Sequence, residues 1–367
     1  MNKTSTVFIS IHLFFQILFL LVNGSTSWAG NELREFYSGV RCLGMGGACV
    51  AVVNDETALI VNPAALGKLR DLYGTIIDPE IESSGNNATM YSTKAYSNPI
   101  DLTQVKETAD ATREKYYHWK GQIFPSIVGK NFGLGLLGTY TLDAEMNSAG
   151  TEMDTYYRND YALVFGYNFR FFDGRIKLGF NGKIISRIEV NNSTLDPTGA
   201  LDLPTIASEG TGFSTDVGLI LAAPWTYIPT LSAVVRNVGG TRFDKKDGLR
   251  LQASSRPTEL KQDMDVGIAI FPINSNRVRS TWTVEYQGVL TVKDETDTAK
   301  RIHAGFELNM YDILFLRAGY NQRYWTAGLE LSSEHIQIQV ASYGEEIGTV
   351  DSTREDRRLV GKFALRF

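Results

Sequence analysis

The chain has few of the residues that carry most enzyme chemistry. Among 367 residues there are two cysteines and four histidines. Two cysteines are too few for a disulfide scaffold, and the sequence contains neither an H-E-x-x-H nor a G-x-S-x-G motif. The glycine run at 44–47 is not a dinucleotide loop, because Cys49 stands where the third glycine would be. We therefore expect no enzymatic activity, no catalytic residue, no metal site and no cofactor.

An excess of positive charge is also lacking. The chain has 36 Lys and Arg against 41 Asp and Glu, which gives a formal net charge of −5. A protein of this sign does not attract the phosphate backbone, so the charge argues against nucleic acid as a partner.

Long apolar runs are absent beyond the N-terminus. The single run, residues 7–22, follows Lys3 and precedes Ser27-Trp28-Ala29, a small-x-small cleavage pattern. This arrangement predicts a cleaved secretory signal peptide over residues 1–29. No later segment reaches the roughly 18 apolar residues of a membrane helix. If the mature chain lies in a membrane, a closed β-barrel is the architecture left to it.

Several segments alternate apolar and polar residues with the period of two that a strand requires. Alternation alone does not separate a membrane barrel from a soluble sandwich, but the connections do, because tight turns and long loops alternate as in bacterial outer-membrane barrels. Asp173-Gly174 is the clearest hairpin signal, whereas the connection at 321–323 is shorter than this rule expects. The expected strands are 121–129, 132–144, 156–172, 175–190, 211–223, 229–238, 261–271, 278–292, 300–310, 313–320, 324–332, 335–344 and 358–367.

The last strand gives the barrel its direction and its strand count. Phe363, Leu365 and Phe367 share one face of it, opposite Lys362 and Arg366. This pattern resembles the C-terminal strand by which the barrel-assembly machinery recognises outer-membrane barrels. An end on the periplasmic side requires an even count, so one more strand is expected, either at 87–97 or from Tyr73. We predict an all-β fold, a transmembrane antiparallel β-barrel of 14 strands over residues 71–367.

The segment at 30–70 precedes the barrel, and we expect it to enter the lumen as a plug (hatch), since a tube of 14 strands is wider than its own side chains fill. Residues 54–56 are suited to cap a short helix over 57–61. Asn62 and Pro63 predict the N-cap and first position of another helical turn, which Gly67 ends. Glycines in the run at 44–47 allow close backbone approach or a positive φ.

The sequence Arg41-x-Leu-Gly-Met-Gly-Gly-Ala, followed by an acidic turn and Asn-Pro-Ala-Ala-Leu at 62–66, resembles the N-terminal signature of FadL-type long-chain fatty acid transporters and the related PorV/PorQ and UPF0164 outer-membrane proteins. The resemblance covers about 30 residues, and residues 125–135 are similar to early strands of those families. It implies a plugged barrel of 14 strands in the bacterial outer membrane. Candidates for plugging and gating are Arg41, Gly44, Gly46, Gly47, Asp55, Asn62 and Pro63.

Cys42 and Cys49 stand where these families usually have small or apolar residues. An extended chain would hold the two cysteines roughly 23 Å apart, so we expect two buried thiols, with a disulfide as the alternative if the glycines fold the chain back. His303 and His335 are expected to line the lumen. A helix is predicted within 100–117, packed on the barrel, and glycines 133, 135 and 138 are candidates for either a strand kink or close packing.

Two functions follow from the resemblance. In the FadL branch, a barrel passively transports hydrophobic small molecules, which enter an extracellular pocket and leave laterally through a strand kink. In the PorV branch, the barrel is a component of protein secretion or surface assembly and holds a protein partner. A structural or general-porin role is a third hypothesis. The partners expected in every case are the lipid bilayer and the barrel-assembly machinery.

Overall fold

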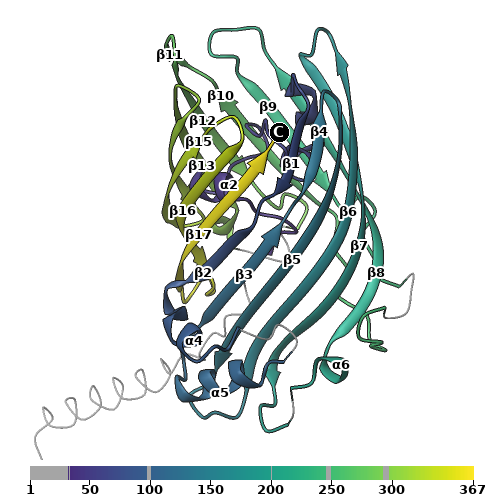
Figure 1. Ribbon diagram of the computed structural model, residues 1–367, viewed down its shortest axis with the longest axis vertical. Coiled ribbons are helices and arrows are strands. Elements are labelled where there is room, and N and C mark those ends of the chain that lie inside the picture. Colours follow the sequence, from purple (N-terminus) through teal and green to yellow (C-terminus); the bar gives the residue numbers. More distant parts are fainter. Residues whose placement is uncertain (1–31, 33, 97–100, 200, 245–248, 292–296) are drawn as a thin grey trace, which may run out of the picture.

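A computed structural model describes residues 32, 34–96, 101–199, 201–244, 249–291 and 297–367, so the expected signal peptide at 1–29 lies outside the described residues. Seventeen strand segments form one closed sheet in which every described pairing is antiparallel (Figure 1). Among the described residues, no helix is long and apolar enough to cross a membrane. The bounds are β1 Tyr73–Ile77, β2 Glu80–Ser84, β3 Tyr117–Ile123, β4 Ser126–Gly129, β5 Phe132–Met146, β6 Met153–Phe171, β7 Ile176–Leu195, β8 Ser208–Ala222, β9 Thr230–Arg236, β10 Asp263–Ile270, β11 Ile273–Ser275, β12 Val278–Tyr286, β13 Ile302–Met310, β14 Leu314–Asn321, β15 Tyr324–Ser332, β16 Ile336–Glu346 and β17 Glu355–Arg366.

The 17 segments make 14 spans, because prolines interrupt three of them. β1 and β2 flank Pro79 and both pair with β17; β3 and β4 flank Pro125 and both pair with β5; β10 and β11 flank Pro272 and both pair with β12. Proline has no N–H to give to the ladder, so it divides a strand without removing it from the sheet. The prediction of 14 strands is confirmed.

The first span begins at Tyr73, as one of the two alternatives expected. The other alternative, a strand at 87–97, is wrong, because Ala88–Ser92 forms helix α4. The helix predicted within 100–117 is α5, Thr103–Ala111, which buries Val105 and Ala109. Together with α6, Leu203–Ile206, these helices lie at the end of the barrel that carries the long connections (Figure 1).

The barrel wall is much taller on one side. β5 to β8 contain 15 to 20 residues each, whereas β12 to β15 contain 8 or 9. About 9 to 11 tilted residues cross a bilayer, so the long strands extend beyond it. Their inner faces pack there with α4 and α5 in an apolar cluster that includes Met90, Val105 and Leu142.

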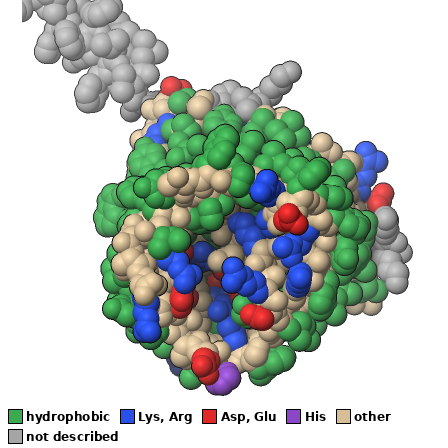
Figure 2. Space-filling model, turned by 90° about the horizontal axis from the view of Figure 1, so that it is seen from above, with side chains coloured by type: hydrophobic (Ala, Val, Ile, Leu, Met, Phe, Trp, Pro, Cys, Tyr) green, Lys and Arg blue, Asp and Glu red, His purple; other side chains and the backbone are tan. Residues whose placement is uncertain are grey.

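Apolar side chains cover the outside of the barrel. Leu136, Ile184, Phe213 and Leu329 are 44 to 58% exposed and all point outward, and apolar side chains encircle the barrel when it is viewed along its axis (Figure 2). Soluble proteins rarely expose apolar patches of more than a few hundred Å². An outer face of this extent is suited to the hydrocarbon core of a bilayer.

The inner face is largely polar. Lys183, Arg187, Glu285, Glu307 and Arg317 are all at most 5% exposed and point into the lumen. The central hollow seen from the end of Figure 1 that carries the C-terminus is surrounded by Lys and Arg side chains (Figure 2). Polar-in and apolar-out alternation is therefore the rule along these strands.

Two expectations about single positions are corrected. His335 does not line the lumen: it lies exposed in the turn before β16, because β15 ends at Ser332. The glycines of β5 do not interrupt its pairing, since β5 pairs with β6 over its whole length without a register shift. They serve close packing instead: a Cβ on Gly135 would lie 2.6 Å from the Phe124 ring.

Candidate functional site: the filled lumen

Residues 34–69, here called the N-terminal segment, lie inside the barrel. The segment contains α2 (Val40–Gly44), α3 (Ala58–Val61) and the 3₁₀ helix η1 (Pro63–Lys68). Its apolar side chains form one buried cluster with inward residues of the wall, among them Val128, Val164 and Ile220. In this part of the lumen the segment is packed as a core.

The two cysteines form a disulfide, so the expectation of two thiols is wrong. Cys42 and Cys49 have Cα atoms 5.5 Å apart, because the chain folds back between them instead of running extended. α2 ends at Gly44, and the Gly47 N–H then donates to the Cys42 carbonyl over 2.8 Å. Gly46 and Gly47 have φ values of +67° and +83°, which L side chains rarely adopt. The glycines therefore decide the pairing that the spacing left open.

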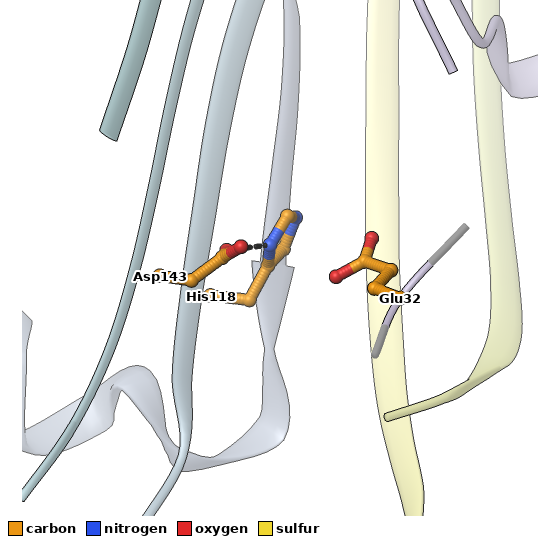
Figure 3. Close-up of side chains that lie close together, drawn as sticks. All are labelled: Glu32, His118 and Asp143. Atoms are coloured by element: carbon orange, nitrogen blue, oxygen red, sulfur yellow. Dashed lines mark hydrogen bonds and ion pairs between the residues drawn. The ribbon is translucent and has the colours of Figure 1, made fainter. Parts of the chain in front are cut away.

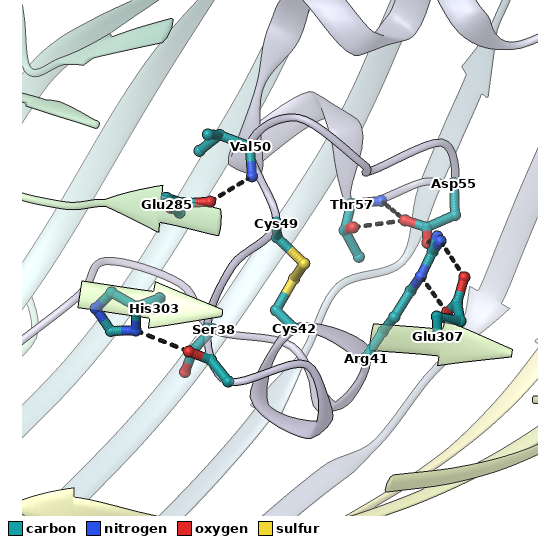
Figure 4. Close-up of a disulfide and its surroundings, with 12 residues drawn as sticks. Ser38, Arg41, Cys42, Cys49, Val50, Asp55, Thr57, Glu285, His303 and Glu307 are labelled. Carbon is teal, nitrogen blue, oxygen red and sulfur yellow. Dashed lines mark hydrogen bonds and ion pairs between the residues drawn. A yellow bond between two sulfur atoms is a disulfide. The ribbon is translucent and has the colours of Figure 1, made fainter. Parts of the chain in front are cut away.

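The loop closed by this disulfide is held against the wall by its backbone (Figure 4). His303 of β13 bonds the Gly46 carbonyl over 2.8 Å, and Thr326 of β15 donates to the Gly44 carbonyl over 3.0 Å. His303 is thus a lumen residue, as expected, but it contacts the segment and not an open channel. A Cβ on Gly46 would lie 2.5 Å from the Ala304 carbonyl oxygen, so only glycine fits.

Arg41 makes a bidentate ionic contact between the segment and the wall (Figure 4). Its guanidinium donates to both carboxylate oxygens of Glu307 on β13, over 3.0 and 2.9 Å, and to Asp55 over 2.8 Å. Burial alone would raise the pKa of Asp55, but Arg41 and a hydrogen bond from Thr57 outweigh it and hold that pKa well below its usual range. Arg41 therefore links Asp55, 14 positions away within the segment, to Glu307 on the wall.

The Asn-Pro sequence forms the cap that was predicted. Asn62 accepts a hydrogen bond from the Ala64 N–H over 3.0 Å, and Pro63 takes the first helical position. The Asn62 amide also reaches Ser232 on β9, over 2.8 Å. η1 continues through Gly67 to Lys68, so Gly67 does not end it as expected. Gly67 serves close approach, because a Cβ there would lie 2.2 Å from the Asn168 side-chain oxygen.

Sequence patterns did not identify the wall partners of the segment. Glu56 is 2% exposed and binds Arg366 of β17 over 2.7 Å, and Glu285 accepts from the Val50 N–H over 2.9 Å. Asn181 donates to the Leu59 carbonyl over 2.9 Å. The sequence signal for these partners is a polar residue on the inward face of a strand. Many positions share this signal, so it does not single out the residues that contact the segment.

A cluster of Glu32, His118 and Asp143 has side chains of the types that bind metals (Figure 3). The donors are already engaged: His118 contacts Asp143 over 2.6 Å and Glu82 over 2.8 Å through its two ring nitrogens. Arg34 bonds Asp143, and Arg358 bonds both oxygens of Glu32. A metal would have to displace two guanidinium groups and lie among cations, so this cluster fits an ion-pair network and not a metal centre.

Two cavities lie between the segment and the wall. The smaller, about 80 Å³, is next to the Glu32–His118 network. The larger, about 260 Å³, has Phe36, Tyr37, Ile60 and Leu260 as the apolar residues of its lining. Most of its other lining residues are charged, of both signs, including Arg34, Arg158, Lys183, Arg187, Arg236, Asp216 and Asp265.

Comparisons with known proteins identify the architecture. No protein-family model and no curated protein matches the sequence. Among solved structures, the Pseudomonas putida toluene transporter TodX aligns with a TM-score of 0.52 at 13% identity, over 90% of this chain and 97% of TodX. A deltaS2 mutant of TodX aligns with a TM-score of 0.55 at 12% identity, over 90% and 99% of the two chains. The CymD monoaromatic hydrocarbon channel gives 0.51 at 10% identity, over 89% and 96%.

This chain has the barrel fold of those channels. At identities of 10 to 13% the likeness shows the fold alone, and the fold by itself does not establish a function.

Proposed function

We propose that this protein is an outer-membrane channel for passive transport of hydrophobic compounds, with residues 30–70 as its plug. The observation that carries the proposal is a lumen filled by a segment that polar contacts attach to β13, β15 and β17. Arg41, Glu56 and the Gly46 carbonyl each contact a wall side chain. Contacts of this kind are exchanged for water when the segment moves, so a route can open without unfolding the barrel. The likeness in fold to TodX and CymD supports the same function.

The larger cavity favours an amphipathic acid as substrate. Phe36, Tyr37, Ile60 and Leu260 offer apolar contact, and Arg158 is one of the cations in the same lining. A long-chain fatty acid combines an apolar chain with one carboxylate, so it can contact both the apolar residues and a cation of this lining. Its volume of about 260 Å³ is below the roughly 300 to 1,000 Å³ of sites for ligands of drug size. The segment must therefore shift before a full chain enters.

Uptake assays with cells that express the full chain test this proposal. We expect faster uptake of radiolabelled oleate than in cells with an empty vector, and a smaller gain for toluene. Deletion of residues 31–66 is expected to abolish selective uptake while the barrel still assembles, as judged by heat-modifiable migration on SDS gels. Uptake equal to the empty vector overturns the transport proposal. Selective uptake that survives the deletion overturns the plug assignment.

A PorV/PorQ-like role in secretion or surface assembly is the second candidate. It is favoured by the small volume and charged lining of the two cavities beside the segment. Native mass spectrometry of the protein in mild detergent separates the two functions. A retained adduct of lipid size favours transport, and a stoichiometric protein partner without an adduct favours secretion.

A further inference from the structure

The largest cavity described is on the outside of the barrel. It is a trough of about 1020 Å³ lined by residues from Arg175, just before β7, to Tyr320 of β14, here called the outer trough. The walls of the outer trough are outward side chains such as Leu231, Ile268, Trp282 and Phe306, all of which belong to the face that meets lipid.

Strand register shows how the outer trough runs. Leu221 pairs with Leu231, which pairs with Ile268, and the row continues across the strands. A second row, two residues away along each strand and on the same outward face, forms the other wall. The first row is Leu221, Leu231, Ile268, Val284, Ala304 and Tyr320, and the second is Ile270, Trp282, Phe306 and Ala318.

Because barrel strands are tilted, a row that crosses them at right angles runs obliquely from one rim to the other. Leu221 is next to the short 223–229 turn, at the rim that carries the C-terminus, whereas Tyr320 is next to the 321–323 turn at the opposite rim. The outer trough therefore traverses the apolar belt of the barrel.

Glycines on the inner side make the floor of the outer trough low. Between the two rows, Gly305 pairs with Gly319, and neither has a side chain to hold the wall away from the N-terminal segment. A Cβ on Gly305 would lie 2.5 Å from the Met45 carbonyl oxygen, and one on Gly319 would lie 2.5 Å from the Gly46 nitrogen. The outward residues Ala304 and Ala318 add little height on the other side. The wall is thin here, and its backbone touches the segment directly.

One end of the outer trough is chemically different. Among the described residues that line it, Arg175 is the only charged one, and Trp225 and Pro229 lie at the same end. The Arg175 side chain is exposed, and among the described residues it forms no ion pair with a carboxylate. Tryptophan is typical of the boundary between lipid chains and headgroups. An apolar trough with an aromatic rim and one cation at the rim matches an amphiphile with an anionic headgroup.

We propose that the outer trough binds one anionic phospholipid of the periplasmic leaflet. Its acyl chains lie along the two side-chain rows, and its phosphate is bound by Arg175. Charge complementarity selects this occupant over a zwitterionic lipid, since one basic side chain at a membrane surface contributes about 1 kcal/mol, or roughly fivefold in affinity.

Tryptophan quenching by brominated lipid tests the proposal. The protein carries Trp119→Phe and Trp325→Phe and is held in dodecylmaltoside micelles. Among the described residues, Trp225 and Trp282 are then the fluorescent reporters. Brominated phosphatidylglycerol is titrated at a few equivalents, and brominated phosphatidylcholine serves as the comparison. We expect saturable quenching by the anionic lipid at about one equivalent, with roughly fivefold weaker binding of the zwitterionic lipid. Arg175→Gln is expected to remove the difference between the two lipids.

Filling the outer trough provides the second test. Ala304→Phe is expected to weaken binding of both lipids, whereas Ala327→Phe, an exposed position on the neighbouring lipid face outside the lining, leaves binding unchanged. Equal, unsaturable quenching by both lipids in all variants overturns the proposal. The proposal is also overturned if oleate binds tightly and phosphatidylglycerol cannot displace it. A dimer that cross-linking shows to cover Trp282 would overturn it as well.

Discussion

Loss of the Arg41 side chain is expected to release the N-terminal segment from the wall. In Arg41→Met the Glu307 carboxylate, whose side chain is 5% exposed, loses two of its hydrogen bonds and keeps Arg317 at 2.7 Å. Breaking a fully buried pair costs about 3 to 5 kcal/mol. The low end applies, because Arg41 is 15% exposed and Asp55 is 21% exposed. A cost of about 3 kcal/mol raises the population of released segment roughly a hundredfold.

Single-channel recording in planar lipid bilayers measures that population as the fraction of time spent open. Arg113→Met is the matched control, since Arg113, in the turn after α5, and its partner Asp110 are 42% and 49% exposed, and exposed pairs contribute at most about 1 kcal/mol. We expect Arg41→Met to open roughly a hundredfold more often than the control. An open fraction within about threefold of the control, in barrels that migrate as folded, refutes the role of this contact.

Three further predictions concern the disulfide, one lysine and the C-terminus. The Cys42–Cys49 bridge spans a sequence separation of 7, and its reduction removes about 2 to 3 kcal/mol of stabilisation that comes from constraining the chain. Dithiothreitol should therefore increase the open fraction of the channel. A Cys42→Ala, Cys49→Ala variant should not respond to dithiothreitol. Burial, with Lys177 and Arg41 nearby, lowers the pKa of Lys68 to about 7. Above that pH the released segment binds more protons than the docked one, so the equilibrium constant for docking should rise by up to about tenfold per pH unit from pH 7 towards 10. Lys68→Met should flatten this pH profile. The Phe367 backbone exchanges hydrogen bonds of 3.1 and 2.9 Å with Gly74, and deleting Phe367 should lower the yield of assembled barrel. Phe172→Ala, in an exposed turn, should leave the yield unchanged. Normal assembly without Phe367 contradicts its role as an assembly signal.

Period-two alternation and turn chemistry were enough to predict most of the wall. Thirteen expected strands correspond to described spans, because each strand has its own lipid face and its own short turn, both of which are local properties. The first span was ambiguous, since Pro79 divides it into two segments of five residues. Short segments carry too little alternation to be told from a loop, and pairing with β17 decides them.

Inside the lumen, less of the structure could be predicted from residue types alone. The Asn62-Pro63 cap was predicted because it forms within a few residues. The disulfide was not, since the outcome depended on positive φ at Gly46 and Gly47, and those angles are fixed by the close approach of β13 and β14. Arg41 was singled out by the signature, but its partner Glu307 lies 266 residues away.

The sequence by itself determined that this chain forms an antiparallel barrel with an apolar exterior, because strand period, turn residues and span length act over neighbouring positions. Only the tertiary structure decided which inward carboxylate meets Arg41, which backbone groups hold the disulfide loop, and where the wall thins into the outer trough. Those contacts join residues hundreds of positions apart, and their geometry exists only once the barrel has closed around the N-terminal segment.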